Sequence, residues 1–210
     1  AGNTHFIDFD LLTQMGLLKE ADYESVNFGE DPTSVDYERI FYARRPILET
    51  AVKNFLANQS FQADLKSFEK NNCLWLDDFA EFMAIKEHFG NQALQKWDDK
   101  KAVARDPKTL EKYRTMLADQ IQYFKVTQYF FFKQWSELKD YANQRGIKII
   151  GDMPIYVAAD SVEVWTKPEL FQLDKERNPL FVAGVPADQF SATGQLWGNP
   201  HYDWEEHKKQ

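Results

Sequence analysis

The sequence predicts an α/β fold in which most residues are helical. Apolar side chains recur at helical spacing over residues 110–141, behind the start signal Asp106-Pro107. The β-branched run Ile147–Ile150 follows directly after Gly146, as a buried strand follows a helix in a parallel α/β unit.

The composition is that of an ordinary globular protein with one large domain or one and a half small ones. Of the 210 residues, 43% are hydrophobic and 28% are charged, which argues against disordered, collagen-like and coiled-coil chains. The formal charge of -8 disfavours binding to nucleic acid and to an anionic membrane surface. The sequence has no signal stretch and no run of about 18 apolar residues. The single cysteine, Cys73, excludes an internal disulfide and is expected to be reduced and partly buried.

The first third of the chain is expected to be a lead-in segment followed by a helix. Before residue 35 the only helical stretch is Leu11–Leu18, and Phe28–Pro32 predicts a turn. Helical spacing starts at Asp36 and extends to Leu56, with Pro46 as a predicted kink or break.

The middle of the chain predicts more helices. A short one covers Phe61–Phe68, and another covers Leu76–Phe89 and ends at Gly90, a residue that favours a left-handed cap. From Asp106 a single helix of roughly 39 residues is expected to extend to Gly146. Its aromatic face must be buried against other parts of the protein.

The last third is expected to be a strand followed by long, structured loops. Asp152 follows the predicted strand Ile147–Ile150, at the end where parallel α/β proteins place their chemistry. From Met153 onward prolines alternate with glycines, and structured loops of that length are usually functional.

Several of these segments are specific enough to indicate a family. They are Ala1–Asn3, Ile7–Leu12, Ile147–Ala158, Pro168–Asp174, Val182–Pro186, Thr193–Pro200 and Tyr202–Trp204. Together they closely resemble the amylomaltase family of 4-α-glucanotransferases. The chain departs from the family pattern at Thr4, where the family often has proline, and at Ala187 and Gln189, where it often has proline and tyrosine.

The resemblance implies a cytoplasmic enzyme that transfers α-1,4-glucan segments to the 4-hydroxyl of an acceptor sugar. The reaction would be a retaining double displacement that uses a carboxylate nucleophile and a carboxylic acid/base about 5 to 5.5 Å apart. The resemblance implies no metal or organic cofactor, and α-1,4-glucans (maltodextrins) as the binding partners.

The same resemblance assigns substrate-binding residues. Asp152 matches a position that shapes the sugar site, and the other candidates lie in the segment that matches the family's glucan-binding loop: Asp188, Phe190, Ser191, Gln195, Trp197 and Asn199. Aromatic rings can stack on sugar C–H faces, while the polar groups can bond sugar hydroxyls. Trp165 and Phe171 are expected to belong to the core.

No catalytic residue is assigned, because the resemblance places the catalytic carboxylates outside this chain. The family's nucleophile lies in a run resembling Arg-Ile-Asp-His, which this sequence lacks. Ala1 starts within a family segment and Lys208–Gln210 lie partway into a helix, so we expect an internal fragment. It is expected to be inactive alone and to need the remainder of the same polypeptide.

The resemblance also implies the architecture, part of a (β/α)8 TIM barrel with an inserted helical subdomain. Residues 1–30 are then a barrel lead-in segment, 31–105 the inserted helical subdomain, and 106–210 the barrel helix, strand and glucan-binding loop. Exposed strand edges and an unmatched aromatic helix face favour self-association of the fragment. Two alternatives stay open: a non-catalytic carbohydrate-binding module, and an α-glucan hydrolase of the same superfamily.

Overall fold

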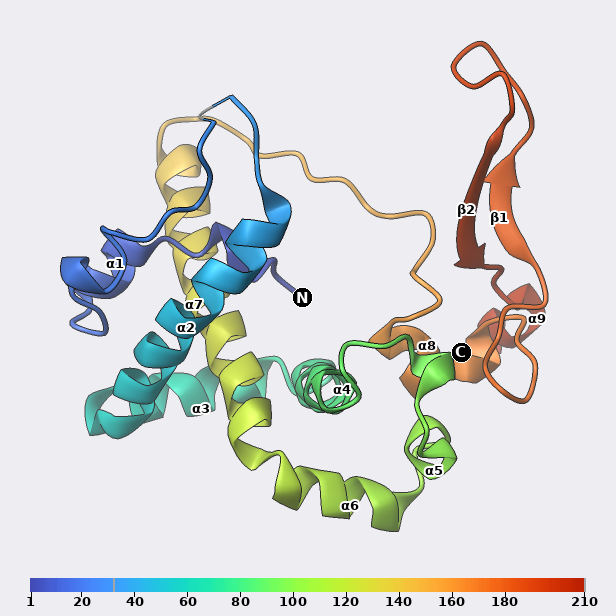
Figure 1. The fold of residues 1–210 in the computed structure, drawn as a ribbon, viewed down its shortest axis with the longest axis horizontal. Coiled ribbons are helices and arrows are strands. Elements are labelled where there is room, and N and C mark those ends of the chain that lie inside the picture. The colour runs from blue at the N-terminus through green and yellow to red at the C-terminus, as the bar shows by residue number, and fades with distance from the viewer. Residues whose placement is uncertain (32, 210) are drawn as a thin grey trace. The chain divides into compact units, whose positions relative to one another are not determined.

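The computed structural model describes residues 1–31 and 33–209, which form two compact units (Figure 1). The first unit holds Ala1–Ala80 and Asp119–Ile150, and the second holds Glu81–Ala118 and the residues from Gly151 onward. Pro32, part of the predicted turn, lies outside the described residues. Within the described ranges, no helix is long and apolar enough to cross a membrane.

The first unit is an assembly of helices around an aromatic core. Its helices are α1 (Phe9–Gln14), α2 (Tyr37–Ala57), α3 (Gln62–Asn71), the first turns of α4 (Leu76–His88) and most of α7 (Ala118–Gln144). Phe55 of α2 is 0% exposed, and its ring lies 4.9 Å from Phe61 and 5.2 Å from both Tyr129 and Phe130 of α7. The helices predicted between Leu11 and Phe89 are confirmed, although α1 begins and ends earlier than expected. Cys73 is exposed, not partly buried, because it lies in the turn between α3 and α4.

Two glutamines of α7 attach the N-terminal segment to that helix. The Gln128 side chain accepts a bond from the Gly2 amide (2.6 Å) and donates one to the Gly2 carbonyl (3.0 Å). Gln134 pairs in the same way with Asp8, at 2.8 and 3.0 Å. Gln128 is 1% exposed and Gly2 is half-buried, so each polar group satisfies the other away from bulk water.

Helix α2 does not end at Pro46. It continues from Tyr37 to Ala57 with the proline inside it. Proline removes the N–H that would bond the Tyr42 carbonyl one turn earlier. Both residues are exposed, so water can satisfy that carbonyl and the helix tolerates the proline.

The predicted helix of roughly 39 residues is in fact two helices. Helix α6 (Pro107–Met116) starts at the predicted cap, where the Asp106 carboxylate accepts bonds from the Thr109 amide and hydroxyl, each at 2.9 Å. These bonds hold the pKa of Asp106 below its usual value. Leu117 then leaves the helical conformation, with φ −111° and ψ 24°, and α7 begins. The interruption lies where the chain passes from the second unit to the first, and no glycine or proline marks it.

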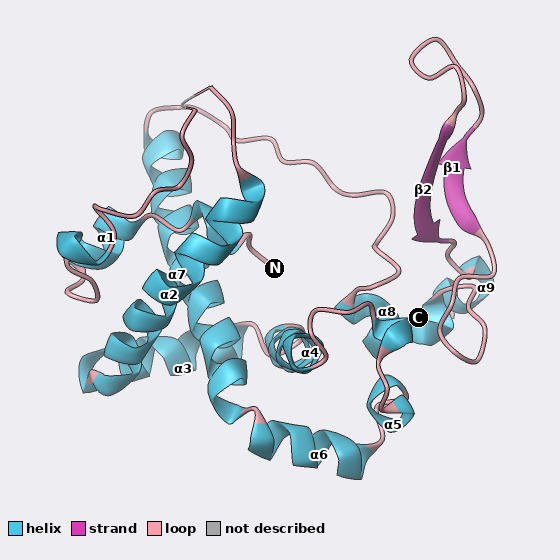
Figure 2. Ribbon diagram, viewed as in Figure 1, coloured by secondary structure: helices cyan, strands magenta, loops and turns pink. Residues whose placement is uncertain are grey.

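The predicted strand Ile147–Ile150 is not formed. Helix α7 ends near Gly146 as expected, with φ +74° at the glycine, and the following residues have no regular structure (Figure 2). Ile147 and Ile150 are 59% and 94% exposed. A strand needs neighbours that pair with its backbone groups, and the sheet found among the described residues consists of two antiparallel strands elsewhere in the chain.

The second unit packs short helices around two tryptophans. Besides the rest of α4, its helices are α5 (Lys100–Val103), α6, α8 (Val162–Thr166) and α9 (Trp204–His207). Trp97 and Trp165 are both 0% exposed, and Phe82 lies 5.6 Å from the first ring and 5.7 Å from the second. The Trp165 indole N–H donates to the Ala102 carbonyl at 2.9 Å. Trp165 and Phe171, which is 6% exposed, are core residues as predicted.

A β-hairpin replaces part of the predicted loop region. Strands β1 (Val182–Val185) and β2 (Gln195–Pro200) pair antiparallel, with Gly184 opposite Leu196. The strands approach closely at the glycine, since a Cβ built there would lie 2.6 Å from the Gln195 carbonyl oxygen. The sequence signal for this hairpin is the apolar run that ends at Val185, but its glycines and prolines favour the loop interpretation.

Candidate functional site

The loop between β1 and β2 carries three of the predicted site residues, and its own hydrogen bonds shape it. Asp188 Oδ1 accepts bonds from the amides of Phe190 (2.8 Å) and Ser191 (2.9 Å). The Ser191 hydroxyl donates to the Gly194 carbonyl at 2.8 Å. Phe190 is 84% exposed. Asp188 and Ser191 therefore fold the loop tip, and the loop presents Phe190 to solvent.

Strand β2 presents the indole of Trp197 at the surface in a fixed orientation. The Trp197 ring N–H donates to Oε1 of Gln195 at 2.9 Å, and the tryptophan is 46% exposed. Both residues lie on the same face of the strand because they are two positions apart. Gln195 therefore holds a partly exposed aromatic ring in one position.

The Tyr156 ring lies beside Trp197, and two further rings stack on Tyr156; none of the three was in the predicted set. The Tyr156 ring lies 6.4 Å from Trp197, and it stacks on Tyr202 at 5.9 Å and on His201 at 6.3 Å. Tyr156, His201 and Tyr202 are each half-buried. The available signal was an excess of aromatics in a loop-rich segment, which does not reveal which rings stack together.

Asp152 and Asn199 lie in different surroundings. Asp152 is exposed in a segment without regular structure, and within the described residues its carboxylate has no hydrogen bond or ion pair. The Asn199 side chain donates to the Val157 carbonyl at 2.8 Å, so it connects β2 to the same segment. The other candidates thus lie on the hairpin, while no hydrogen bond or ion pair among the described residues joins Asp152 to them.

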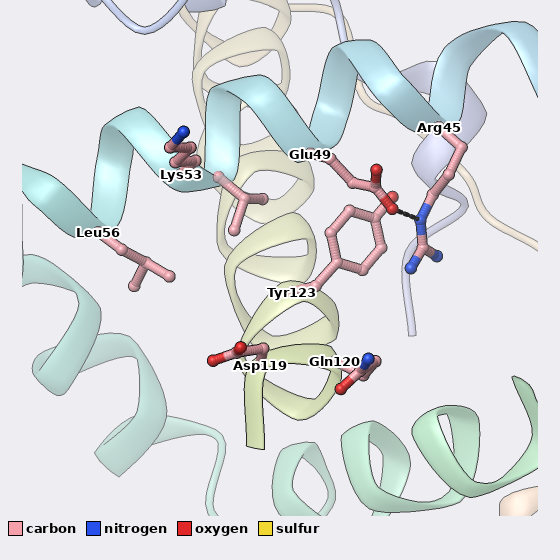
Figure 3. Close-up of a pocket in the computed structure, with 8 residues that line it drawn as sticks. Arg45, Glu49, Lys53, Leu56, Asp119, Gln120 and Tyr123 are labelled. Carbon is pink, nitrogen blue, oxygen red and sulfur yellow. Dashed lines mark hydrogen bonds and ion pairs between the residues drawn. The ribbon is translucent and has the colours of Figure 1, made fainter. Parts of the chain in front are cut away.

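Two hollows among the described residues, one on each unit, hold none of these candidates. In the first unit a groove of about 400 Å³ is lined by Arg45, Glu49, Val52, Lys53, Leu56, Asp119, Gln120 and Tyr123 (Figure 3). The Arg45 guanidinium covers the Tyr123 ring at 3.7 Å and pairs with Glu49 at 2.7 Å, so the face on which a sugar could stack is already occupied. In the second unit a hollow of about 660 Å³ lies beside residues 168–177. There the Asn178 side chain and backbone amide lower the pKa of Asp174.

The chemistry of the hairpin surface is that of a binding site for a polar ligand with apolar faces. The exposed rings offer stacking surfaces, and the amides and carboxylates offer donors and acceptors. In the part of the chain that the structure covers, no three His, Cys, Asp or Glu side chains gather in a way that could hold a metal ion.

Comparisons with known proteins place these features in a family. The sequence model that describes the 4-alpha-glucanotransferase family of glycoside hydrolases matches residues 1–210 of this chain. A 4-alpha-glucanotransferase of Streptococcus pneumoniae is 55% identical over 208 residues, and a chloroplastic/amyloplastic one of Solanum tuberosum is 37% identical over 211 residues. These alignments cover 98% and 99% of this chain, but 40% and 36% of the relatives.

A solved structure agrees with the sequence comparisons. The amylomaltase from Streptococcus agalactiae, determined in complex with acarbose, matches with a TM-score of 0.96 and 60% identity, over 100% of this chain and 42% of that chain. The chain therefore spans about two fifths of the length of these relatives. Because the family model matches along the whole sequence, the chain belongs to the 4-alpha-glucanotransferase family.

Proposed function

We propose that this chain is the glucan-binding part of a longer 4-α-glucanotransferase. The observation that carries the proposal is the hairpin, in which Gln195 orients the partly exposed indole of Trp197 beside Tyr156. The family membership and the acarbose complex of the S. agalactiae relative support α-1,4-glucans as the ligands.

The proposed reaction moves a glucan segment through a covalent intermediate. A carboxylate attacks the anomeric carbon while a second carboxylic acid protonates the leaving 4-oxygen. The 4-hydroxyl of an acceptor sugar then displaces the enzyme carboxylate and gives its proton back to the second carboxylate, so that two inversions give net retention. The residues described above bind and orient the sugar in this scheme. Asp188 and Ser191 act mainly by folding the loop and Asn199 by holding the segment at Val157, whereas Trp197, Phe190 and Asp152 face the ligand. No metal or organic cofactor enters the scheme.

A binding experiment tests the assignment of the site. In the full-length protein, Trp197→Ala is expected to weaken maltoheptaose binding about 10- to 30-fold, measured by calorimetry, because a central aromatic contact is worth about 1.4 to 2 kcal/mol. Tyr37→Ala, at a 78% exposed tyrosine on the first unit, is the control. Equal affinity of the Trp197→Ala variant and the wild type would contradict the assignment.

An activity experiment tests the reaction. Maltotriose is incubated with this 210-residue chain and with the full-length protein, and glucose release and longer glucans are followed. We expect a ladder of longer glucans from the full-length protein alone. Glucose release without longer products would indicate a hydrolase, and binding without turnover would indicate a non-catalytic module. Activity of the isolated chain would place catalytic carboxylates among these residues.

The proposed architecture is the partial (β/α)8 barrel with an inserted helical subdomain, divided at residues 1–30, 31–105 and 106–210. The exposed run Ile147–Ile150 supports it, since β-branched residues that follow a helix are typical of a barrel strand whose neighbours lie in the rest of the enzyme. A structure of the full-length protein tests whether these residues pair with other strands.

We further propose a cytoplasmic location and self-association of the isolated chain. Trp135, Leu138 and Tyr141 of α7 are 38%, 56% and 56% exposed, which leaves an apolar surface on this helix. Light scattering of the 210-residue chain is expected to give a mass above that of a monomer. A monomeric profile across concentration would refute the association.

A further inference from the structure

The segment between Ile155 and Asp160 is held from two sides within the second unit. On the hairpin side, the Tyr202 hydroxyl donates to the Ile155 carbonyl at 3.0 Å, and Asn199 donates to the Val157 carbonyl at 2.8 Å. The Asn199 bond connects the segment to β2, the strand that carries Trp197, and the Tyr202 bond connects it to the residues just after that strand. The segment has no helix or strand of its own, so such bonds decide where it lies.

On the other side, α4 and the turn after it hold the same segment. The Gln95 side chain donates to the Ala159 carbonyl at 3.0 Å and to the Arg177 carbonyl at 3.1 Å. The Asp160 carboxylate accepts a bond from the Leu94 amide at 2.9 Å and forms an ion pair with Lys86 of α4.

The Lys86–Asp160 ion pair restrains the position of the segment's end. The side chains of Lys86 and Asp160 are 21% and 25% exposed, so salt and water screen them less than a surface pair. Loss of one partner leaves the other charge half-buried and uncompensated. The Lys86 ammonium is therefore a strong restraint on Asp160 and on the backbone before it.

We propose that Lys86 and Gln95 are positioning residues for the glucan site. They bond neither Asp152 nor Trp197, but they fix the end of the segment that carries Tyr156 and follows Asp152, and Tyr156 lies beside the Trp197 ring. The distance between these sugar-binding groups thus depends on two side chains outside the site. This inference rests on the proposed function, because the positioned site is the proposed glucan site.

The first experiment measures directly whether Lys86 holds Asp160 in place. In Lys86→Met, which keeps the aliphatic stem and removes the charge, the Leu94 amide is expected to exchange its proton about tenfold faster, because Asp160 is no longer held in place to accept its bond. Lys86→Arg keeps the charge and is expected to restore the exchange rate. Lys133→Met, which removes an exposed ion pair with Glu137 in the first unit, is the matched control.

The second experiment measures the consequence for the glucan. In the full-length protein, Lys86→Met is expected to raise KM for maltotriose about tenfold and to change kcat less than about threefold. The expected rise in KM is smaller than the roughly 10²-fold loss of rate that a 1 Å misplacement can cause, because Gln95 still holds the segment. Lys86→Arg is expected to restore KM. If Lys86 had a purely structural role, Lys86→Met would lower stability without raising KM more than it changes kcat. If Lys86→Met does not fold, Gln95→Met, which removes two bonds and no charge, is measured in its place.

Two results overturn the inference. One is a Leu94 exchange rate that is the same in Lys86→Met and the wild type, and the other is an unchanged KM in an active Lys86→Met enzyme. A wild-type full-length protein without glucan transfer is a different failure, because it refutes the proposed function itself.

Discussion

Replacement of three glycines in the hairpin by alanine separates the cost of a left-handed backbone from the cost of a clash between the new Cβ and a neighbouring carbonyl oxygen. Gly198 has φ +77° and no heavy atom within 4 Å of a built Cβ, so alanine there meets only the cost of a left-handed backbone. Gly184 is outside the left-handed region, but its Cβ would lie 2.6 Å from the Gln195 carbonyl oxygen. Gly194 combines both, with φ +76° and a Cβ 2.6 Å from the Val185 carbonyl oxygen.

The expected costs follow from these geometries. A left-handed conformation costs a residue with a Cβ about 1 to 2 kcal/mol, so Gly198→Ala is expected to destabilise the hairpin by that amount. A clash with backbone that cannot move aside costs about 1 to 3 kcal/mol, which is the expectation for Gly184→Ala. Gly194→Ala is expected to cost roughly the sum, about 2 to 5 kcal/mol.

Hydrogen exchange is the suitable assay, because a hairpin can open without unfolding the whole protein. The Asp188 amide, which donates to the Ser191 carbonyl at 3.0 Å within the loop, reports on the opening. Its protection is expected to fall about 5- to 30-fold in Gly198→Ala and more than about 30-fold in Gly194→Ala, since 1.4 kcal/mol is tenfold. Equal effects at Gly198 and Gly194 would refute the argument that the close carbonyl matters.

Three further predictions concern the core, a helix cap and the N-terminal segment. Trp165→Ala is expected to lower the free energy of unfolding by about 3 to 5 kcal/mol in urea titration, because the indole is 0% exposed, whereas Trp204→Ala, at a 64% exposed ring, should change it by less than about 1 kcal/mol. The lowered pKa of Asp106 means that its ionised form stabilises the fold above its unfolded pKa of about 3.9, and this contribution is lost as the pH falls through the lower folded value. Below about pH 4 the thermal midpoint of the wild type should therefore fall more steeply than that of Asp106→Asn, and parallel curves would contradict this. Gln128→Met leaves the Gly2 amide and carbonyl without their partner and should cost about 1 to 3 kcal/mol, seen as faster proteolysis of the N-terminal segment; an unchanged cleavage rate would count against it.

The part of the candidate site that could be predicted is the part that a motif encodes. Trp197 stands out because glycines surround it in a loop-rich segment that resembles a known family. The stacking of Tyr156 on Tyr202 could not be found in this way, since it joins residues 46 positions apart and depends on side-chain bonds to the carbonyls of Ile155 and Val157. The roles of Lys86 and Gln95 were also out of reach, because a lysine or a glutamine on a helical stretch looks solvated until its partner is known.

The sequence by itself determined most helices of the first two thirds, two of their caps and the family. Helical periodicity and signals such as Asp106-Pro107 and Gly90 act over a few residues, so the local sequence encodes them. Only the tertiary structure decided the interruption at Leu117, the unpaired state of Ile147–Ile150 and the hairpin. A strand exists only where another strand satisfies its backbone groups. That condition depends on residues far away in the chain, which local sequence patterns do not contain. No glycine or proline marks the interruption at Leu117, so the local sequence gives no signal for it either.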